Sequence, residues 1–121
     1  MAKKILLVGD NTDQRRVVHG ILEPMGTILE ASNGKDALRL IATEKPEMML
    51  LDAAMVDLDG LSIMRAAHFL DPALPIVLLT EEHDTESAKS VLANGISAYI
   101  AKPFYPEGLR DKVRRLFTMK I

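Results

Sequence analysis

The chain has 121 residues, of which 48% are hydrophobic and 26% are charged, a composition typical of one globular domain over residues 1–121. Its 15 basic and 17 acidic residues leave a formal net charge of −2, so charge does not favour binding to nucleic acid or to an anionic membrane. The absence of cysteine excludes disulfides, thiolate catalysis and cysteine-bound metals, and it is compatible with the reducing cytoplasm, where we expect the protein.

Short apolar runs alternate with amphipathic segments, which predicts repeated β-α units that share one parallel sheet. The predicted strands are, in chain order, Lys4–Val8, Thr27–Ala31, Met48–Leu51, Ile76–Leu79 and Ala98–Ala101. The first run is too short for a signal peptide, and none is long enough to span a membrane. Thr27–Ala31 has the weakest pattern and fits a sheet edge, whereas Ile76–Leu79 is apolar on both faces and fits the sheet centre.

One helix is predicted after each strand, from capping residues and from apolar residues spaced three and four apart. The helices are expected to begin near Asn11 or Thr12, Ser32–Gly34, Leu61, Asp84 and Pro106, and the first four to end before Pro24, Pro46, Asp71 and Asn94. The residues expected to face the core are Val17, Val18, Ile21 and Leu22 in the first helix, Ala37, Leu38 and Ile41 in the second, Ala88, Val91 and Leu92 in the fourth, and Leu109, Val113, Leu116 and Phe117 in the last.

Four polar residues of different chemistry follow the ends of four predicted strands. They are Asp10, Asp52, Thr80 and Lys102. Because open parallel sheets bind ligands at the carboxyl ends of their strands, we expect these side chains to meet there. Two carboxylates suit Mg²⁺, a hydroxyl and an ammonium suit a phosphoryl group, and a carboxylate such as Asp52 can act as the nucleophile. Either aspartate alone could be a helix or loop cap, but the four together favour phosphoryl transfer.

Four segments resemble the receiver domain of bacterial two-component response regulators, and the resemblance covers the chain end to end. They are Ile5–Asn11, Leu51–Gly60, Leu79–Thr80 and Lys102–Phe104. The resemblance implies a CheY-like, flavodoxin-like α/β fold: a doubly wound, five-stranded parallel sheet of order 2-1-3-4-5 with five helices on its two faces. It also implies a phosphoprotein that acts as a switch in phosphorelay signal transduction rather than an enzyme.

The resemblance assigns a role to each residue of the site. Asp52 would be the phosphoacceptor, with a histidine kinase or a phosphotransfer protein as its donor. Asp10, Asp52 and the backbone carbonyl of Ala54 would bind Mg²⁺, and Thr80 and Lys102 would bind the phosphoryl group. Self-phosphorylation from small donors and slow self-dephosphorylation are expected to follow.

The resemblance further implies how phosphorylation is read. Tyr99 would turn inward when Thr80 is drawn toward the phosphoryl group. The surface formed by the fourth helix, fifth strand and fifth helix would then bind a downstream protein or a second copy of the chain. We expect this domain to bind neither nucleic acid nor a membrane directly.

Two residues depart from the receiver pattern. Gly9 stands where the family usually has the first of two adjacent acids, so weaker Mg²⁺ binding is expected. Glu81 follows Thr80 where a small residue is usual, and its charge would either gate the site against anionic donors or replace the acid missing at Gly9. These departures support an alternative function, that of a degenerate pseudo-receiver which binds proteins without phosphorylation.

A different enzyme class provides a second alternative. Asp57–Gly60 is similar to the nucleophile motif of haloacid-dehalogenase-type phosphatases, in which Asp57 would be the nucleophile. That motif requires a buried strand immediately before its first aspartate, whereas here the apolar run already ends at Asp52. We therefore rank this interpretation below the receiver.

The remaining polar candidates have simpler interpretations. The three histidines, His19, His68 and His83, lack the spacing of metal ligands and fit ordinary surface or helix-face positions. The basic residues of the last helix are interrupted by acids and lack an aromatic platform, so they indicate a solvated face rather than a nucleic-acid surface.

Overall fold

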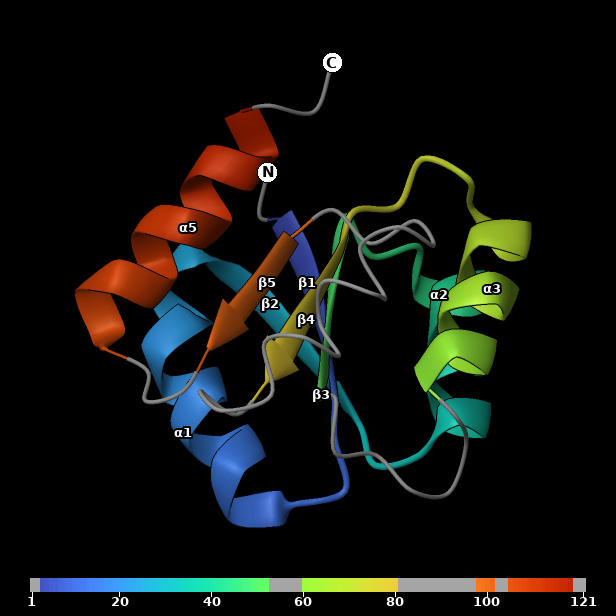
Figure 1. The fold of residues 1–121 in the computed structure, drawn as a ribbon, viewed down its shortest axis with the longest axis horizontal. Coiled ribbons are helices and arrows are strands. Elements are labelled where there is room, and N and C mark those ends of the chain that lie inside the picture. Colours follow the sequence, from blue (N-terminus) through green and yellow to red (C-terminus); the bar gives the residue numbers. More distant parts are fainter. Residues whose placement is uncertain (1–2, 53–59, 81–97, 102–104, 119–121) are drawn as a thin grey trace.

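In this computed structural model, residues 3–52, 60–80, 98–101 and 105–118 are described. Five strands form one parallel sheet of order β2-β1-β3-β4-β5, which confirms the order implied by the receiver resemblance (Figure 1). The strands are β1 (Lys3–Val8), β2 (Gly26–Ala31), β3 (Met48–Asp52), β4 (Ile76–Thr80) and β5 (Ala98–Ala101). β2 lies at an edge, as predicted, and β3 lies at the centre.

Helices cover the sheet on both sides. They are α1 (Thr12–Leu22), α2 (Gly34–Glu44), α3 (Gly60–Leu70) and α5 (Pro106–Thr118), with a short 3₁₀ helix η1 (Glu23–Met25) after α1. Figure 1 shows α1 and α5 together on one side of the sheet and α2 and α3 together on the other. The helix predicted to begin at Asp84 lies outside the described residues.

Local chemistry sets the helix ends. The side chain of Asn11 accepts a hydrogen bond from the backbone amide of Gln14 at 2.9 Å, so Asn11 is the N-cap of α1. Asn33 caps α2 in the same way, through the amide of Asp36 at 2.8 Å. Helix α2 ends at Glu44 and is followed by the C-cap Lys45, whose φ of 50° is left-handed; the next residue, Pro46, cannot continue a helix.

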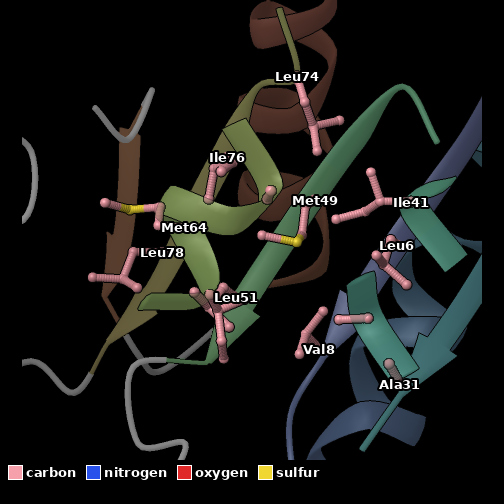
Figure 2. Close-up of a cluster of buried hydrophobic side chains, with 13 residues drawn as sticks. Leu6, Val8, Ala31, Ile41, Met49, Leu51, Met64, Leu74, Ile76 and Leu78 are labelled. Carbon is pink, nitrogen blue, oxygen red and sulfur yellow. The ribbon is translucent and has the colours of Figure 1, made fainter. Parts of the chain in front are cut away.

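Strand alternation divides the core into two layers. One layer, under α2 and α3, includes Leu6, Val8, Met49, Leu51, Ile76 and Leu78 (Figure 2). The other, under α1 and α5, includes Ile5, Leu7, Met48, Leu50, Val77 and Leu79. Because every residue of β3 is buried, the strand packs on both faces, as a central parallel strand must. The next residue in the alternation after Leu51 is Asp52, whose side chain therefore lies on the α1 and α5 side.

One core prediction is wrong. Val17 was expected to face the core, but it is 59% exposed, whereas the adjacent Val18 is 1% exposed. Successive helical residues are separated by roughly 100°, and the stripe set by Val18, Ile21 and Leu22 leaves Val17 beyond its edge. The other core residues predicted in α1, α2 and α5 are buried or packed against the two layers.

A search of the described helices for a membrane span finds none of sufficient length and apolar character.

Candidate functional site

The strand register brings the predicted site residues toward one edge of the sheet. Val8 of β1 is paired with Leu51 of β3, so the residues that follow, Gly9 and Asp52, are neighbours. On the other side of β3, Asp52 is paired with Leu79, the residue before Thr80. Parallel pairing therefore places the ends of β1, β3 and β4 together, as the spacing of Asp10, Asp52 and Thr80 predicted.

Asp52 is the most deeply placed acid of the described residues. It is 4% exposed, and no other charged residue in the described part of the chain is buried. A carboxylate in such a position costs free energy unless polar groups or a cation compensate it. A buried acid at the mouth of a central strand therefore has the placement expected of a functional carboxylate.

A small pocket opens beside Asp52. Its wall combines backbone and side chains from β1, α1, β3 and β4, among them Gly9, Asn11, Gln14, Arg15 and Asp52. Asp10 does not line the pocket and is exposed at the turn between β1 and α1. The Asp52 carboxylate is thus reached from the pocket, and the Asp10 carboxylate stands at the solvent side of the same edge.

The donor set suits a hard divalent cation without forming a complete cage. Over residues 3–52, 60–80, 98–101 and 105–118, no three histidine, aspartate or glutamate side chains are grouped so as to hold a metal. Asp10 and Asp52 supply two carboxylates, and Mg²⁺ normally completes its shell with waters and phosphate oxygens. These residues therefore fit Mg²⁺ as far as they are described; the predicted third ligand, Ala54, lies outside them.

Gly9 packs closely against Asp52 and leaves little room for a side chain. A Cβ atom at this position would lie 3.3 Å from Asp52 Cβ, 3.6 Å from Asp52 Oδ2 and 3.8 Å from Arg15 Cγ. The contact at 3.3 Å is tight, so the neighbours would have to move by a few tenths of an ångström. The acid that the receiver pattern places at position 9 is thus replaced by a close approach of the Gly9 backbone to Asp52 and Arg15.

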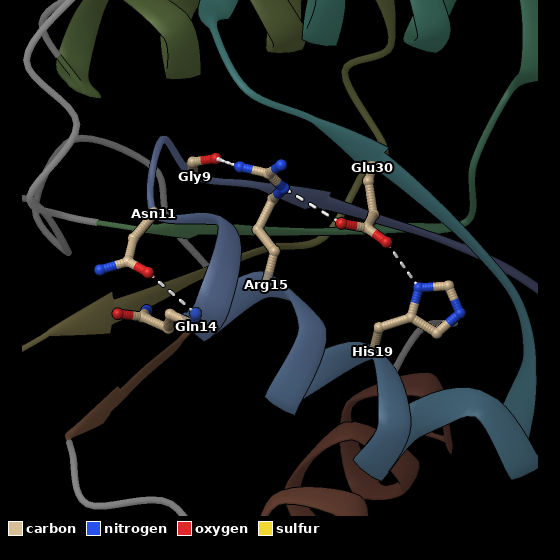
Figure 3. A network of polar contacts seen from close by, with 6 residues as sticks. All are labelled: Gly9, Asn11, Gln14, Arg15, His19 and Glu30. Atoms are coloured by element: carbon tan, nitrogen blue, oxygen red, sulfur yellow. Dashed lines mark hydrogen bonds and ion pairs between the residues drawn. The ribbon is translucent and has the colours of Figure 1, made fainter.

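A polar network beside Gly9 was not predicted from the sequence (Figure 3). Arg15 donates through Nη1 to the carbonyl of Gly9 and through Nε to Glu30 Oε1 at 3.0 Å. His19 Nδ1 lies 2.7 Å from Glu30 Oε2 and acts as donor, because an ionised carboxylate only accepts. Arg15 and His19 are four residues apart on α1, so the sequence indicates that they lie on one face and can share a partner. The local sequence does not indicate that this partner is Glu30 of β2.

The charge state of Glu30 follows from this network. Burial raises the pKa of Glu30, but hydrogen bonds from His19 and Arg15 outweigh burial and hold the pKa below its ordinary value. Glu30 is therefore an anion at neutral pH, and Arg15 is bound to it as an ion pair with the arginine side chain only 16% exposed.

Several predicted residues lie outside the described part of the chain: Ala54, Asp57, Glu81, His83 and Lys102. Thr80 is the last residue of β4, and only its backbone is described. Tyr99 in β5 is partly buried and packs against the core layer under α2 and α3.

The other polar candidates have structural partners. His68 Nε2 lies 3.1 Å from the carbonyl of Leu74. In α5, Arg110 pairs with Glu107, and Arg114 pairs with Asp111. These contacts agree with the solvated helix face predicted for α5.

Comparison with known proteins identifies the family. The family model described as "Response regulator receiver domain" matches residues 5–114, which is most of the chain. The chain therefore belongs to the response regulator receiver domain family, the family that its motifs resemble.

Individual relatives agree with this assignment. The chain is 34% identical over 117 residues to "Response regulator MprA" of Mycolicibacterium vanbaalenii, covering 96% of this chain and 51% of the relative. It is 26% identical over 121 residues to "Sporulation initiation phosphotransferase F" of Bacillus subtilis, covering 99% and 98% of the two chains. The solved structure of the chemotaxis response regulator CheY4 of Vibrio cholerae superposes with a TM-score of 0.86 at 25% identity, covering 96% of this chain and 99% of that one. The chain spans about half the length of several curated relatives that it matches.

Proposed function

We propose that this chain is one receiver domain over residues 1–121 and that Asp52 is its phosphoacceptor. The donor would be the phosphohistidine of a histidine kinase or of a phosphotransfer protein. An Asp52 carboxylate oxygen would form a bond to phosphorus as the phosphorus–nitrogen bond to histidine breaks, and the histidine nitrogen would keep the bonding pair. The observation that carries this proposal is the burial of Asp52 at the carboxyl edge of the sheet, beside a pocket and next to Gly9.

The proposed cofactor is Mg²⁺, with Asp10, Asp52 and the carbonyl of Ala54 as its protein ligands. When bound, the ion would offset the negative charge of the transferring phosphoryl oxygens. Thr80 would donate its hydroxyl hydrogen to one phosphoryl oxygen, and Lys102 would contribute a positive charge to another. Asp52 would attack through a carboxylate oxygen lone pair.

The output would be a shift between two conformations of the surface formed by the predicted fourth helix, β5 and α5. Tyr99 in β5 is the proposed reporter of the phosphoryl group bound near Thr80. A downstream protein or a second copy of the chain would bind the shifted surface. Hydrolysis of the acyl phosphate would reset the switch, so the chain would act as a phosphoacceptor with slow self-dephosphorylation rather than as an enzyme with a separate substrate.

The experiment is phosphorylation by acetyl phosphate with Mg²⁺, followed by mass mapping of the labelled aspartate. We expect one label, on Asp52, and none on Asp52→Ala. A label on Asp57 would instead support the phosphatase-like alternative. Formation of a beryllofluoride adduct in wild type, but not in Asp52→Ala, would be the non-covalent counterpart of the same result.

A pseudo-receiver is the second candidate, and the glycine at position 9 favours it because the site has one carboxylate fewer than the usual pattern. The variant Glu81→Ala distinguishes a working receiver from a pseudo-receiver and also tests the role of Glu81. If the charge of Glu81 gates the site, anionic acetyl phosphate should label Asp52 faster in the variant. Slower labelling with weaker Mg²⁺ binding would make Glu81 a substitute for the missing acid. No label and no adduct in either protein would support the pseudo-receiver.

A further inference from the structure

The turn that carries Asp10 is fixed on both sides at Gly9. The amide of Gly9 donates to the carbonyl of Ala31 in β2 at 3.1 Å. The carbonyl of Gly9 accepts from Nη1 of Arg15 in α1. This carbonyl belongs to the same planar peptide unit as the amide nitrogen of Asp10, so its orientation sets the direction in which Asp10 leaves the strand.

Arg15 cannot move freely, because it is held from its other side. Its Nε donates to Glu30 Oε1 at 3.0 Å, and His19 lies 2.7 Å from the other oxygen of the same carboxylate (Figure 3). Glu30 belongs to edge strand β2, which also receives the amide of Gly9 through Ala31. The chain from His19 through Glu30 and Arg15 to Gly9 therefore connects α1 and β2 to the turn before Asp10.

The positive charge of Arg15 does not by itself favour binding of a cation at the proposed site. Arg15 lines the same pocket as Asp52, and its guanidinium is a fixed positive charge next to the proposed Mg²⁺ ligands. A nearby positive charge opposes binding of a divalent cation. A role for Arg15 in that site must therefore come from geometry, through the hydrogen bond to Gly9.

We infer that Arg15 is a positioning residue for Asp10, held in place by Glu30 and His19. It fixes the Gly9 peptide so that Asp10 is preorganised as a metal ligand. This role of Arg15 rests on the proposed function, in which Asp10 binds the metal. Supports of this kind behind metal ligands commonly change affinity on the order of tenfold when they are removed. Glu30 and His19 contribute by keeping the guanidinium aligned on Gly9.

The test measures Mn²⁺ affinity, using the paramagnetic signal of free Mn²⁺ to count bound ions in wild type, Arg15→Gln and Arg16→Gln. Arg16 follows on the same helix and is exposed, so its variant removes the same charge without a contact to Gly9. Positioning predicts that Arg15→Gln weakens binding on the order of tenfold, while Arg16→Gln leaves it unchanged or slightly tighter. Equal or tighter binding in Arg15→Gln would overturn the inference, because a purely electrostatic role predicts that sign.

A second measurement does not depend on the metal. Amide hydrogen exchange of Gly9, whose N–H donates to the carbonyl of Ala31, should in the metal-free protein become faster in Arg15→Gln and Glu30→Gln but not in Arg16→Gln. Arg15→Lys should restore part of the protection, because an ammonium can donate to the carbonyl but cannot also form the fork to Glu30. Unchanged exchange in Arg15→Gln refutes positioning, whereas absence of Mn²⁺ binding in wild type refutes the proposed metal site.

Discussion

At the scale of single residues, the missing side chain of Gly9 affects the site as much as the carboxylate of Asp52 does. Asp52 is buried, yet the neighbouring position 9 has no side chain to share its environment. A side chain at position 9 would have Asp52 and Arg15 as its neighbours. A third carboxylate there would face both a like charge and a cation.

Gly9→Asp should therefore raise Mg²⁺ affinity and lower the stability of the metal-free protein. One added carboxylate near a divalent ion contributes on the order of 1 kcal/mol at a surface-like dielectric, which is a several-fold change in affinity. Repulsion from Asp10 and Asp52 opposes the same charge when no metal is present. Calorimetric titration of Mg²⁺ and urea unfolding measure the two effects.

Gly9→Ala is the matched control for that substitution, since it adds the Cβ atom 3.3 Å from Asp52 Cβ without adding charge. If alanine and aspartate change Mg²⁺ affinity equally, the effect is steric and the electrostatic explanation is wrong. Equal affinities of wild type and Gly9→Asp would mean that another group already supplies the missing charge.

At the scale of elements, two asparagines perform the same local task in different places. Asn11 caps α1 next to Asp10, and Asn33 caps α2 after the edge strand β2. Each satisfies one backbone amide that the first turn of a helix leaves without an intrahelical partner. Helix α1 thus begins at the turn that also carries the proposed metal ligand, whereas α2 does not.

Asn11→Ala and Asn33→Ala should each destabilise the protein by about 1 kcal/mol, the usual cost of losing a side-chain cap. Only Asn11→Ala should also slow labelling of Asp52, because Asn11 lines the pocket beside that carboxylate. Urea unfolding and acetyl phosphate labelling of the two variants provide the comparison. Equal labelling rates would show that the start of α1 does not influence the site.

At the scale of the whole molecule, an ion pair links one helix layer to the edge of the sheet. Arg15 and His19 of α1 both contact Glu30 of β2. Because hydrogen bonds hold the pKa of Glu30 below its ordinary value, the anion is more stable in the folded than in the unfolded protein. Its contribution to folding is present above the unfolded value near 4.5 and is lost as pH falls through the lower folded value.

Wild type should therefore exceed Glu30→Gln in free energy of unfolding at pH 7, and the difference should shrink below about pH 4.5. Urea unfolding at pH 7, 4.5 and 3 measures this difference. Glu23→Gln removes the same charge from an exposed position and serves as control. A constant difference across the pH range would mean that the Glu30 carboxylate does not stabilise the fold through its charge.

The sequence alone determined which segments form strands and helices and which face of each segment is apolar. Periods of 2 and 3.6 residues are local, so they define strands and helices without knowledge of the fold. Parallel strands have their carboxyl ends at one edge of the sheet, so the sequence alone predicts Asp10, Asp52 and Thr80 at that edge. A local pattern is insufficient at Val17 and Val18, because two adjacent valines do not indicate which of them faces the core.

Only the tertiary structure decided what surrounds Asp52. The strand order was implied by the receiver resemblance and not by periodicity, because the pairing of β1 with both β2 and β3 joins distant parts of the chain. That pairing places Gly9 beside Asp52 and brings Glu30 to Arg15. Such contacts depend on register and on the packing of α1 across the sheet, and neither is encoded in the spacing of any single segment.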